Sequence, residues 1–364
     1  MTWLWLGLGL GVLTLGAELL VRGAVGLATA VRISPLVIGL TVVAFGTSAP
    51  ELVVSIQSTL AGKAGIALGN VVGSNIFNVL FILGLSAMII PLRVNQQLIW
   101  LDVPLMIAAS GIVWWMSADG ALGRLEGAGL LTGLVAYTLW LVWQGRKESD
   151  PQVVVEYTAE FPQQKQAGWW ALGRSTGCVL IGLGMLVGGS QLFLEGAVTL
   201  ARQWGLSELV IGLTLVAAGT SLPEVATSIM AAIKGERDLA VGNVVGSNIF
   251  NLLGVLGAAA LLAPQGVAVS AEILAQDFPV MLIVAVACLP IFLTGHVIHR
   301  WEGAVFFAYY LLYTGWLVLS AQEWSLGMHR LTLVLWGLVP LTVVAIIYSL
   351  ISESRTTKVG SLKT

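Results

Sequence analysis

Charged side chains are scarce in this chain of 364 residues: Asp, Glu, Lys and Arg make up 10% of it, while 57% is hydrophobic. Soluble domains usually carry about a quarter charged residues, so the shortage excludes an ordinary soluble globular protein. Basic runs that would bind nucleic acid are also lacking, and the net charge is only −2. The chain has a series of long apolar stretches instead, which predicts an integral membrane protein.

Cysteine and histidine are also rare, with two and three residues. Cys178 and Cys288 both fall inside apolar stretches, where a disulfide framework is not expected. His296, His299 and His329 fall in predicted loops. These shortages argue against a zinc-type or copper-type metal site, which needs thiolate or imidazole ligands. No nucleophile–base pair is visible, so we expect neither an enzyme nor a resident cofactor.

Eleven apolar stretches approach or exceed the roughly 20 residues that a membrane-spanning helix needs. The first is too long for a cleavable signal peptide and is interpreted as a mature span. We therefore predict an all-α integral membrane protein with eleven transmembrane helices. The stretches are roughly Trp3–Val31, Pro35–Ala61, Ile66–Ile90, Leu98–Ser117, Leu125–Trp143, Trp169–Trp204, Glu208–Ile233, Leu239–Ala263, Glu272–Leu293, Trp301–Ser320 and Leu331–Ile351.

Basic residues are distributed unequally between the two predicted sides of the membrane. Only Lys63, Arg124, Arg202 and Arg330 lie on the side of the N-terminus, and most of the others lie opposite. The positive-inside rule then places the N-terminus outside and the C-terminus in the cytoplasm of a multi-pass cell-membrane protein. The longest loop, about 144–168, is polar and is predicted to be a cytoplasmic linker.

The sequence contains an internal repeat, because Ile33–Gly84 aligns without gaps with Leu206–Gly257. Looser matches extend the duplicated unit to about five spans. Since five is odd, the second copy enters the membrane from the opposite side, an inverted-topology repeat of the kind found in secondary transporters. The predicted organisation is a first five-helix repeat (1–145), a cytoplasmic linker (146–168), a second inverted five-helix repeat (169–322), and an extra transmembrane helix with a cytoplasmic tail (323–364).

Each copy interrupts an apolar stretch with a proline and a glutamate: AFGTSAPELVVS in the first, AAGTSLPEVATS in the second. Pro50 has no N–H, so the half-helix before it should end near 43–46 with carbonyl oxygens that need another partner in lipid. A dehydrated cation would satisfy them, since the C-terminus of a half-helix carries negative dipole charge. Hydroxyl and carboxylate oxygens are added by Thr47, Ser48 and Glu51 in the first copy and by Thr220, Ser221 and Glu224 in the second.

The next span of each copy contains GNVVGSNIFN, which supplies more oxygens. Asn70, Ser74 and Asn78 are spaced to share one helix face, as are Asn243, Ser247 and Asn251. An all-oxygen set selects hard cations, and flexible mixed ligands suit Ca²⁺ better than Mg²⁺. Packing or capping explains Asn70, Asn243, Asn75 and Asn248 about as well as ligation does.

Other charged residues inside the spans are interpreted as structural. Glu18 and Arg22 are four apart on one helix and should form an ion pair. Asp102 and Asp277 each precede a proline near the start of a span, so we predict helix-start positions at the membrane interface.

The paired motifs resemble the two alpha repeats of the calcium/cation antiporter superfamily, specifically its prokaryotic sodium/calcium exchanger branch. The resemblance covers the first ten spans and implies Na⁺-driven Ca²⁺ transport by alternating access, with spans one and six moving against a central site. It implies that Glu51 and Glu224 ligate Ca²⁺ and that Ala44 and Ala217 give backbone carbonyls to Na⁺ sites. The predicted metal ligands are Glu51, Glu224, Thr47, Thr220, Ser48, Ser221, Ala44, Ala217, Ser74, Ser247, Asn78 and Asn251.

Several alternatives remain open. Some relatives carry Asp where this chain has Asn251, which leaves two acidic ligands here and room for another coupling ion. An H⁺/Ca²⁺ antiporter of the same fold is therefore the main alternative. A cation channel is disfavoured by the repeat within one chain, and an intramembrane hydrolase by its missing catalytic groups. The expected partners are Ca²⁺, Na⁺ and the lipid bilayer, and a monomer is the expected form.

Overall fold

A computed structural model describes residues 2–31, 33–147, 169–204 and 217–321, together with Leu338, Thr342 and Val344. Helices dominate these ranges. The first half contains α1 (Thr2–Val31), α2 (Pro35–Ile38), η1 (Gly39–Val43), α3 (Ala44–Thr47), α4 (Ala49–Leu60), α5 (Ala64–Phe77), η2 (Asn78–Leu83), α6 (Gly84–Ile89), η3 (Leu98–Asp102), α7 (Val103–Met116), η4 (Ser117–Asp119) and α8 (Arg124–Lys147). The second half contains α10 (Trp169–Gln203), α12 (Ala217–Thr220), α13 (Leu222–Ile233), α14 (Arg237–Phe250), η6 (Asn251–Val255), α15 (Leu256–Leu262), η7 (Ile273–Asp277), α16 (Phe278–Leu293) and α17 (Arg300–Ala321).

Eight of these helical segments are long and apolar enough to cross a membrane, and a ninth is the bent pair Pro35–Thr47 with Ala49–Leu60. Each coincides with one of the predicted spans. The predicted seventh span is described only from Ala217 onward, where Leu222–Ile233 is a shorter apolar helix. Of the predicted linker (146–168), residues 146 and 147 belong to the end of α8, and the rest lies outside the described residues. The predicted eleventh span also lies outside them, apart from the three isolated positions.

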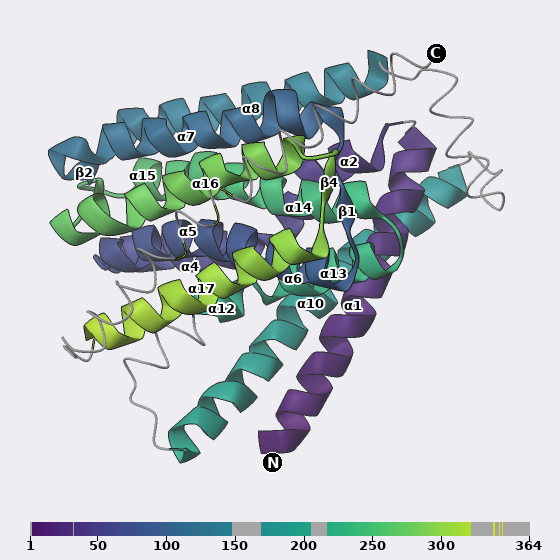
Figure 1. The fold of residues 1–364 in the computed structure, drawn as a ribbon, viewed down its shortest axis with the longest axis horizontal. Helices are drawn as coiled ribbons and strands as arrows, with labels where there is room; N and C mark the ends of the chain where they lie inside the picture. The colour runs from purple at the N-terminus through teal and green to yellow at the C-terminus, as the bar shows by residue number, and fades with distance from the viewer. Residues whose placement is uncertain are drawn as a thin grey trace.

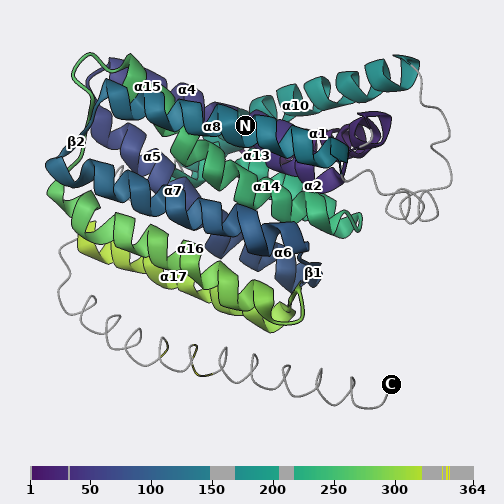
Figure 2. The same cartoon turned by 90° about the horizontal axis from the view of Figure 1, so that it is seen from above.

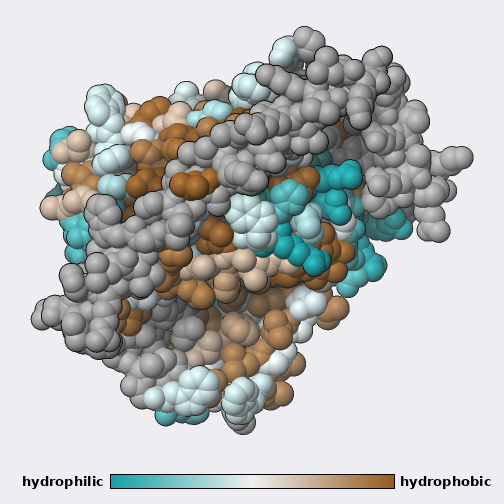
Figure 3. Space-filling view, in the orientation of Figure 1, coloured by the Kyte–Doolittle hydropathy of each residue, from teal (hydrophilic) through white to brown (hydrophobic). Residues whose placement is uncertain are grey.

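The outer surface carries large apolar side chains that water would not favour. Trp115 is 75% exposed, Leu139 65% and Ile283 67%. Figure 3 shows apolar residues over much of one face, with polar residues gathered mainly towards its right side. An apolar exterior of this extent fits a lipid surround and agrees with the membrane prediction.

The interior is occupied by two helices that carry the same motif, α5–η2 and α14–η6. Both views place them between the outer helices (Figures 1 and 2). Every residue of α14 from Leu239 to Phe250 is buried. In both helices the α-helical turns give way to a π-helix at the third motif asparagine, Asn78 or Asn251. π-helical turns are rare and frequent at functional sites.

Helices α1 and α10 form a closely packed antiparallel pair that crosses the other helices steeply in Figure 1. Glycines repeat every seven residues on both, at 9, 16 and 23 and at 182, 189 and 196. A Cβ added to Gly16 would lie 2.8 Å from the Met185 Cβ, and one added to Gly182 would lie 2.7 Å from the Leu20 backbone nitrogen. Glycine is therefore required for the backbones to approach this closely.

Loops of the two halves are joined by short strands that the sequence did not predict. β1 (Leu92–Arg93) pairs antiparallel with β4 (Val297–Ile298). β2 (Ala121–Leu122) pairs antiparallel with β3 (Val267–Ala268). Each pair satisfies backbone groups that would otherwise lie unpaired at the ends of apolar helices.

The prediction that Asp102 and Asp277 lie at helix starts is wrong, because a π-helical turn precedes each of them within a continuous helix. Asp102 is fully buried, and the helix is continuous across it from η3 into α7. Its carboxylate accepts hydrogen bonds from the Tyr137 hydroxyl at 2.9 Å and from Gln97 Nε2 at 3.2 Å. Asp277 is half-buried and accepts a hydrogen bond of 3.0 Å from Tyr313. Both aspartates therefore join neighbouring helices.

Candidate cation site

The proline-containing helix breaks one residue before Ala49. α3 ends at Thr47, Ser48 has φ −82° and ψ 9°, and α4 then begins with a bend of 44°. The predicted end near 43–46 is therefore too early, because Pro50 removes only the donor that would reach the Gly46 carbonyl. The Ala44 carbonyl still accepts a hydrogen bond of 3.0 Å from the Ser48 N–H.

The break places Glu51 in the first turn of α4, where the N-terminal helix dipole favours a negative charge. The second copy repeats this arrangement. Ser221 has φ −89° and ψ 9°, and Glu224 lies in the first turn of α13. Both glutamates are fully buried.

Each serine at a break is hydrogen-bonded to the glutamate of the other copy. The Ser48 hydroxyl donates to Glu224 Oε1 at 2.9 Å, and the Ser221 hydroxyl donates to Glu51 Oε1 at 2.8 Å. Ser221 Oγ also lies 3.1 Å from Ser74 Oγ. Because each serine is three residues from its own glutamate, these bonds bring the two carboxylates together.

The first motif asparagines support these segments rather than facing the carboxylates. Asn70 Nδ2 donates to the Glu51 carbonyl at 3.2 Å and to Ser55 Oγ at 2.9 Å, and its Oδ1 accepts from the Thr220 hydroxyl at 3.3 Å. Asn243 makes the equivalent bonds to the Glu224 carbonyl and Ser228 Oγ, with the Thr47 hydroxyl donating to its Oδ1. Each threonine hydroxyl thus lies within hydrogen-bond distance of the asparagine of the other copy.

Five of the nine buried side-chain oxygens that lack a hydrogen-bond partner among the described residues belong to predicted ligands. Buried polar atoms in proteins are nearly always paired, so each exception needs a physical reason. We call the following five atoms the open oxygens, and none has a partner among the described residues. They are Glu51 Oε2, Glu224 Oε2, Asn78 Oδ1, Asn251 Oδ1 and Ser247 Oγ.

The open oxygens comprise two carboxylate, two amide and one hydroxyl oxygen. This donor set fits a hard cation, and two carboxylates match the charge of one Ca²⁺. Within the described part of the chain, no group of three or more His, Cys, Asp and Glu side chains could hold a metal ion. The charge of the candidate site therefore comes from two glutamates, and neutral oxygens supply the remaining contacts.

The comparisons with known proteins agree with this chemistry. The family model described as sodium/calcium exchanger protein matches residues 1–143 and 174–319, well over half of the chain. The chain belongs to the sodium/calcium exchanger family. This is a family of antiporters rather than enzymes, as the sequence predicted.

Individual exchanger-family relatives match over most of their length. The putative antiporter CaxA of Alkalimonas amylolytica is 42% identical over 282 residues, which are 77% of this chain and 86% of CaxA. The inner membrane protein YrbG of Escherichia coli (strain K12) is 36% identical over 283 residues, 76% and 84% of the two chains. The solved structure of the sodium–calcium exchanger NCX_Mj superposes with a TM-score of 0.72 and 31% identity, covering 85% of this chain and 97% of NCX_Mj.

The remaining predicted ligands lie on the short helices that precede the two breaks. The Thr47 hydroxyl lies 3.4 Å from the Ala44 carbonyl, in addition to its bond with Asn243. Ala217 is the first residue of α12, in the place that corresponds to Ala44 at the start of α3. All of the predicted residues thus belong to the four segments that meet at the interior helices.

Sequence reasoning understated Asn75 and Asn248, which lie beside the open oxygens. Both are 2% exposed and hydrogen-bond across the two copies. The only sequence signal was their position inside the duplicated motif.

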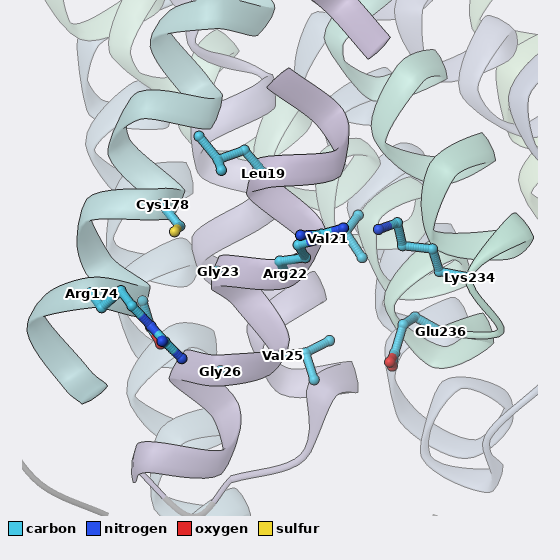
Figure 4. A pocket seen from close by; sticks show the side chains of 11 residues that line it. Leu19, Val21, Arg22, Gly23, Val25, Gly26, Arg174, Cys178, Lys234 and Glu236 are labelled. Atoms are coloured by element: carbon cyan, nitrogen blue, oxygen red, sulfur yellow. The ribbon is translucent and has the colours of Figure 1, made fainter. Parts of the chain in front are cut away.

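A separate cavity of about 430 Å³ lies between α1, α10 and the turn that follows α13. Figure 4 shows Arg22 near its centre, with Arg174 on one side and Lys234 on the other. None of its lining residues is a candidate ligand. The predicted Glu18–Arg22 ion pair is confirmed at 2.5 Å, and Lys234 joins it at 3.0 Å.

Proposed function

We propose that this chain is a secondary active antiporter that exchanges Na⁺ for Ca²⁺ by alternating access at a central site. The open oxygens support the proposal, since they are buried, come from both copies of the repeat, and have no hydrogen-bond partner among the described residues. The exchanger-family membership and the likeness to NCX_Mj support the same pair of ions. The proposed ligands are Glu51, Glu224, Thr47, Thr220, Ser48, Ser221, Ala44, Ala217, Ser74, Ser247, Asn78 and Asn251.

The transported ions fit the charge of the site. With Ca²⁺ bound, the two glutamates are neutralised. Without a cation, two buried carboxylates repel each other, so crossing of the unloaded site is unfavourable. Several Na⁺ ions bound on the return step would neutralise the two glutamates in the same way. The site would then cross only when a cation is bound, which is the condition for exchange.

The proposed architecture is an inverted repeat of five and five transmembrane helices (1–145 and 169–322), a linker (146–168) and an eleventh helix with a tail (323–364). The N-terminus is proposed to lie outside and the C-terminus in the cytoplasm. The cross-repeat bonds of Ser48 and Ser221 support the two-fold arrangement. The moving element is proposed to be the α1–α10 pair, because its glycine contacts make it one tightly packed unit.

A gradient-exchange assay tests the function. Purified protein in proteoliposomes is loaded with Na⁺ and diluted into Na⁺-free buffer with radiolabelled Ca²⁺, while pH is clamped equally on both sides. We expect Ca²⁺ uptake that depends on the outward Na⁺ gradient. A second set carries an outward H⁺ gradient and no Na⁺, and should take up no Ca²⁺ above protein-free vesicles.

Each other outcome contradicts the proposal. Uptake driven by the H⁺ gradient alone would identify an H⁺/Ca²⁺ antiporter. Uptake at channel rates without counter-transport would identify a channel. Absence of Ca²⁺ movement under both gradients would exclude Ca²⁺ as the substrate.

A further inference from the structure

Asn75 and Asn248 form a closed hydrogen-bonded network with Asn78 and Asn251 where the two interior helices cross. Asn75 Nδ2 donates to the Asn248 carbonyl at 3.2 Å, and Asn248 Nδ2 donates to the Asn75 carbonyl at 3.3 Å. These reciprocal bonds join the backbones of the two copies directly. The network is buried, and it ends on two of the open oxygens.

The orientation of every amide follows from the two carbonyls. A backbone carbonyl can only accept, so the atom that each asparagine, Asn75 or Asn248, presents to it must be the NH₂ group. Oδ1 of Asn75 then faces Asn251 Nδ2 at 3.2 Å, and Oδ1 of Asn248 faces Asn78 Nδ2 at 2.9 Å. Asn78 and Asn251 must therefore turn their NH₂ groups inward to the network and their oxygens outward.

The outward oxygens are the two amide members of the open oxygens. An amide turned by half a rotation would present its NH₂ group to a cation, and that group cannot ligate. The ability of Asn251 to bind a cation through its amide oxygen thus depends on the orientation imposed by Asn75. The same ability of Asn78 depends on Asn248.

We propose that Asn75 and Asn248 are positioning residues that hold the amide oxygens of Asn251 and Asn78 towards the transported cation. The proposal rests on the proposed function. Each positioning residue orients the ligand of the opposite copy. The orientation of the two amide ligands therefore depends on contacts between the two repeats. In this chain the network takes its donors at positions 78 and 251 from neutral amides. A carboxylate at 251 would set an acceptor against the Asn75 oxygen.

The test measures the external Ca²⁺ concentration for half-maximal Na⁺-driven uptake, K0.5, together with the maximal rate per folded protein. Asn75→Leu and Asn248→Leu keep the approximate side-chain size and remove the amide. We expect K0.5 to rise about tenfold in each, as for loss of an outer-shell partner of a metal ligand. The maximal rate should fall much less. Tyr137→Phe removes a buried hydrogen bond away from the site and should leave K0.5 unchanged.

Double variants separate positioning from general stabilisation. Asn75→Leu should add nothing to the K0.5 of Asn251→Ala, because its target is already gone, whereas it should multiply the K0.5 of Asn78→Ala. Asn248→Leu should show the reverse pattern. Equal coupling of Asn75 to both positions would indicate a merely structural role and overturn the proposal.

A third variant leaves the positioning residues intact. Asn251→Asp is nearly isosteric and adds a negative charge, which by charge alone should lower K0.5. The network predicts a raised K0.5, and a lowered one would overturn the proposal even if the leucine variants fail to fold. If the unaltered protein shows Na⁺-driven uptake and Asn75→Leu has the same K0.5, the positioning role is overturned and the proposed function stands. Absence of Ca²⁺ uptake by the unaltered protein would instead overturn the proposed function.

Discussion

The Ser48 hydroxyl donates a hydrogen bond of 2.9 Å to the carboxylate of Glu224, which lies 176 residues further along the chain. Its counterpart runs from Ser221 to Glu51 at 2.8 Å. Each glutamate therefore has one oxygen fixed by the broken helix of the other copy and one open oxygen. Neither copy of the repeat completes the carboxylate arrangement alone.

Removing either serine hydroxyl should weaken Ca²⁺ binding without unfolding the protein. A hydrogen bond to a charged group contributes about 1.5–3 kcal/mol, so Ser48→Ala and Ser221→Ala should each raise K0.5 for Ca²⁺ roughly tenfold. The measurement is Na⁺-driven uptake over a range of external Ca²⁺. Ser110→Ala is the matched control, because Ser110 is equally buried but donates to Met106 of its own helix. Unchanged K0.5 in both test variants would contradict the arrangement.

Neutralising either glutamate should abolish transport. Glu51→Gln or Glu224→Gln keeps the side-chain size and leaves one negative charge in place of two, which no longer balances Ca²⁺. We expect no Na⁺-driven Ca²⁺ uptake above empty vesicles, with a normal gel-filtration profile in detergent.

The control for this change is Glu126→Gln. The Glu126 carboxylate caps the Gly123 N–H at 2.6 Å, and glutamine retains an acceptor oxygen for that role. This variant should transport like the unaltered protein. Retained uptake in either Glu51→Gln or Glu224→Gln would remove that glutamate from the site.

Much of the candidate site could be predicted because its signals are local. Pro50 and Glu51 lie in one short motif, and the duplicated motif indicated that a second set would be present. The break itself is displaced to Ser48, since the loss of one proline donor leaves the preceding turns bonded. Periodicity also suggested that Asn70 would share a ligand face with Asn78, but Asn70 is held by Ser55.

The rest depends on pairings that no local pattern contains. Asn75 and Asn248 are fixed by each other's backbone carbonyls, 173 residues apart. The two strand pairs involve two-residue segments, which are too short for an alternating pattern. Asp102 resembled a helix start beside Pro104, but a π-helical turn, Leu98–Asp102, begins the helix before it.

Truncation after residue 321 should leave exchange intact, because the predicted eleventh span lies outside the repeat. The described contact to this region is a hydrogen bond of 2.8 Å between Tyr309 and Thr342. Loss of this hydrogen bond alone is expected to lower the thermal midpoint by only a few degrees, in line with a net contribution of about 1 kcal/mol. Tyr309→Phe in the full chain is the control for that bond. A truncated protein that folds but cannot transport would assign the C-terminal segment a role in exchange.

The spacing of glycines between α1 and α10 predicts position-dependent effects of a single methyl group. Alanine is a better helix former than glycine by about 1 kcal/mol. At Gly11 an added Cβ meets no described atom within 4 Å, so Gly11→Ala should preserve or raise thermal stability in detergent. At Gly16 and Gly182 the Cβ would press on the facing helix, and overpacking costs about 1–3 kcal/mol.

Gly16→Ala and Gly182→Ala should therefore lower the thermal midpoint and slow Na⁺-driven uptake, since they separate the pair that is proposed to move as a unit. The K0.5 for Ca²⁺ should change little, because neither glycine belongs to the proposed cation site. Combining Gly16→Ala with Gly182→Ala should give less than the sum of the two losses, as their Cβ atoms strain the same contact. Equal behaviour of Gly11→Ala and Gly16→Ala would show that close approach of these helices is not required.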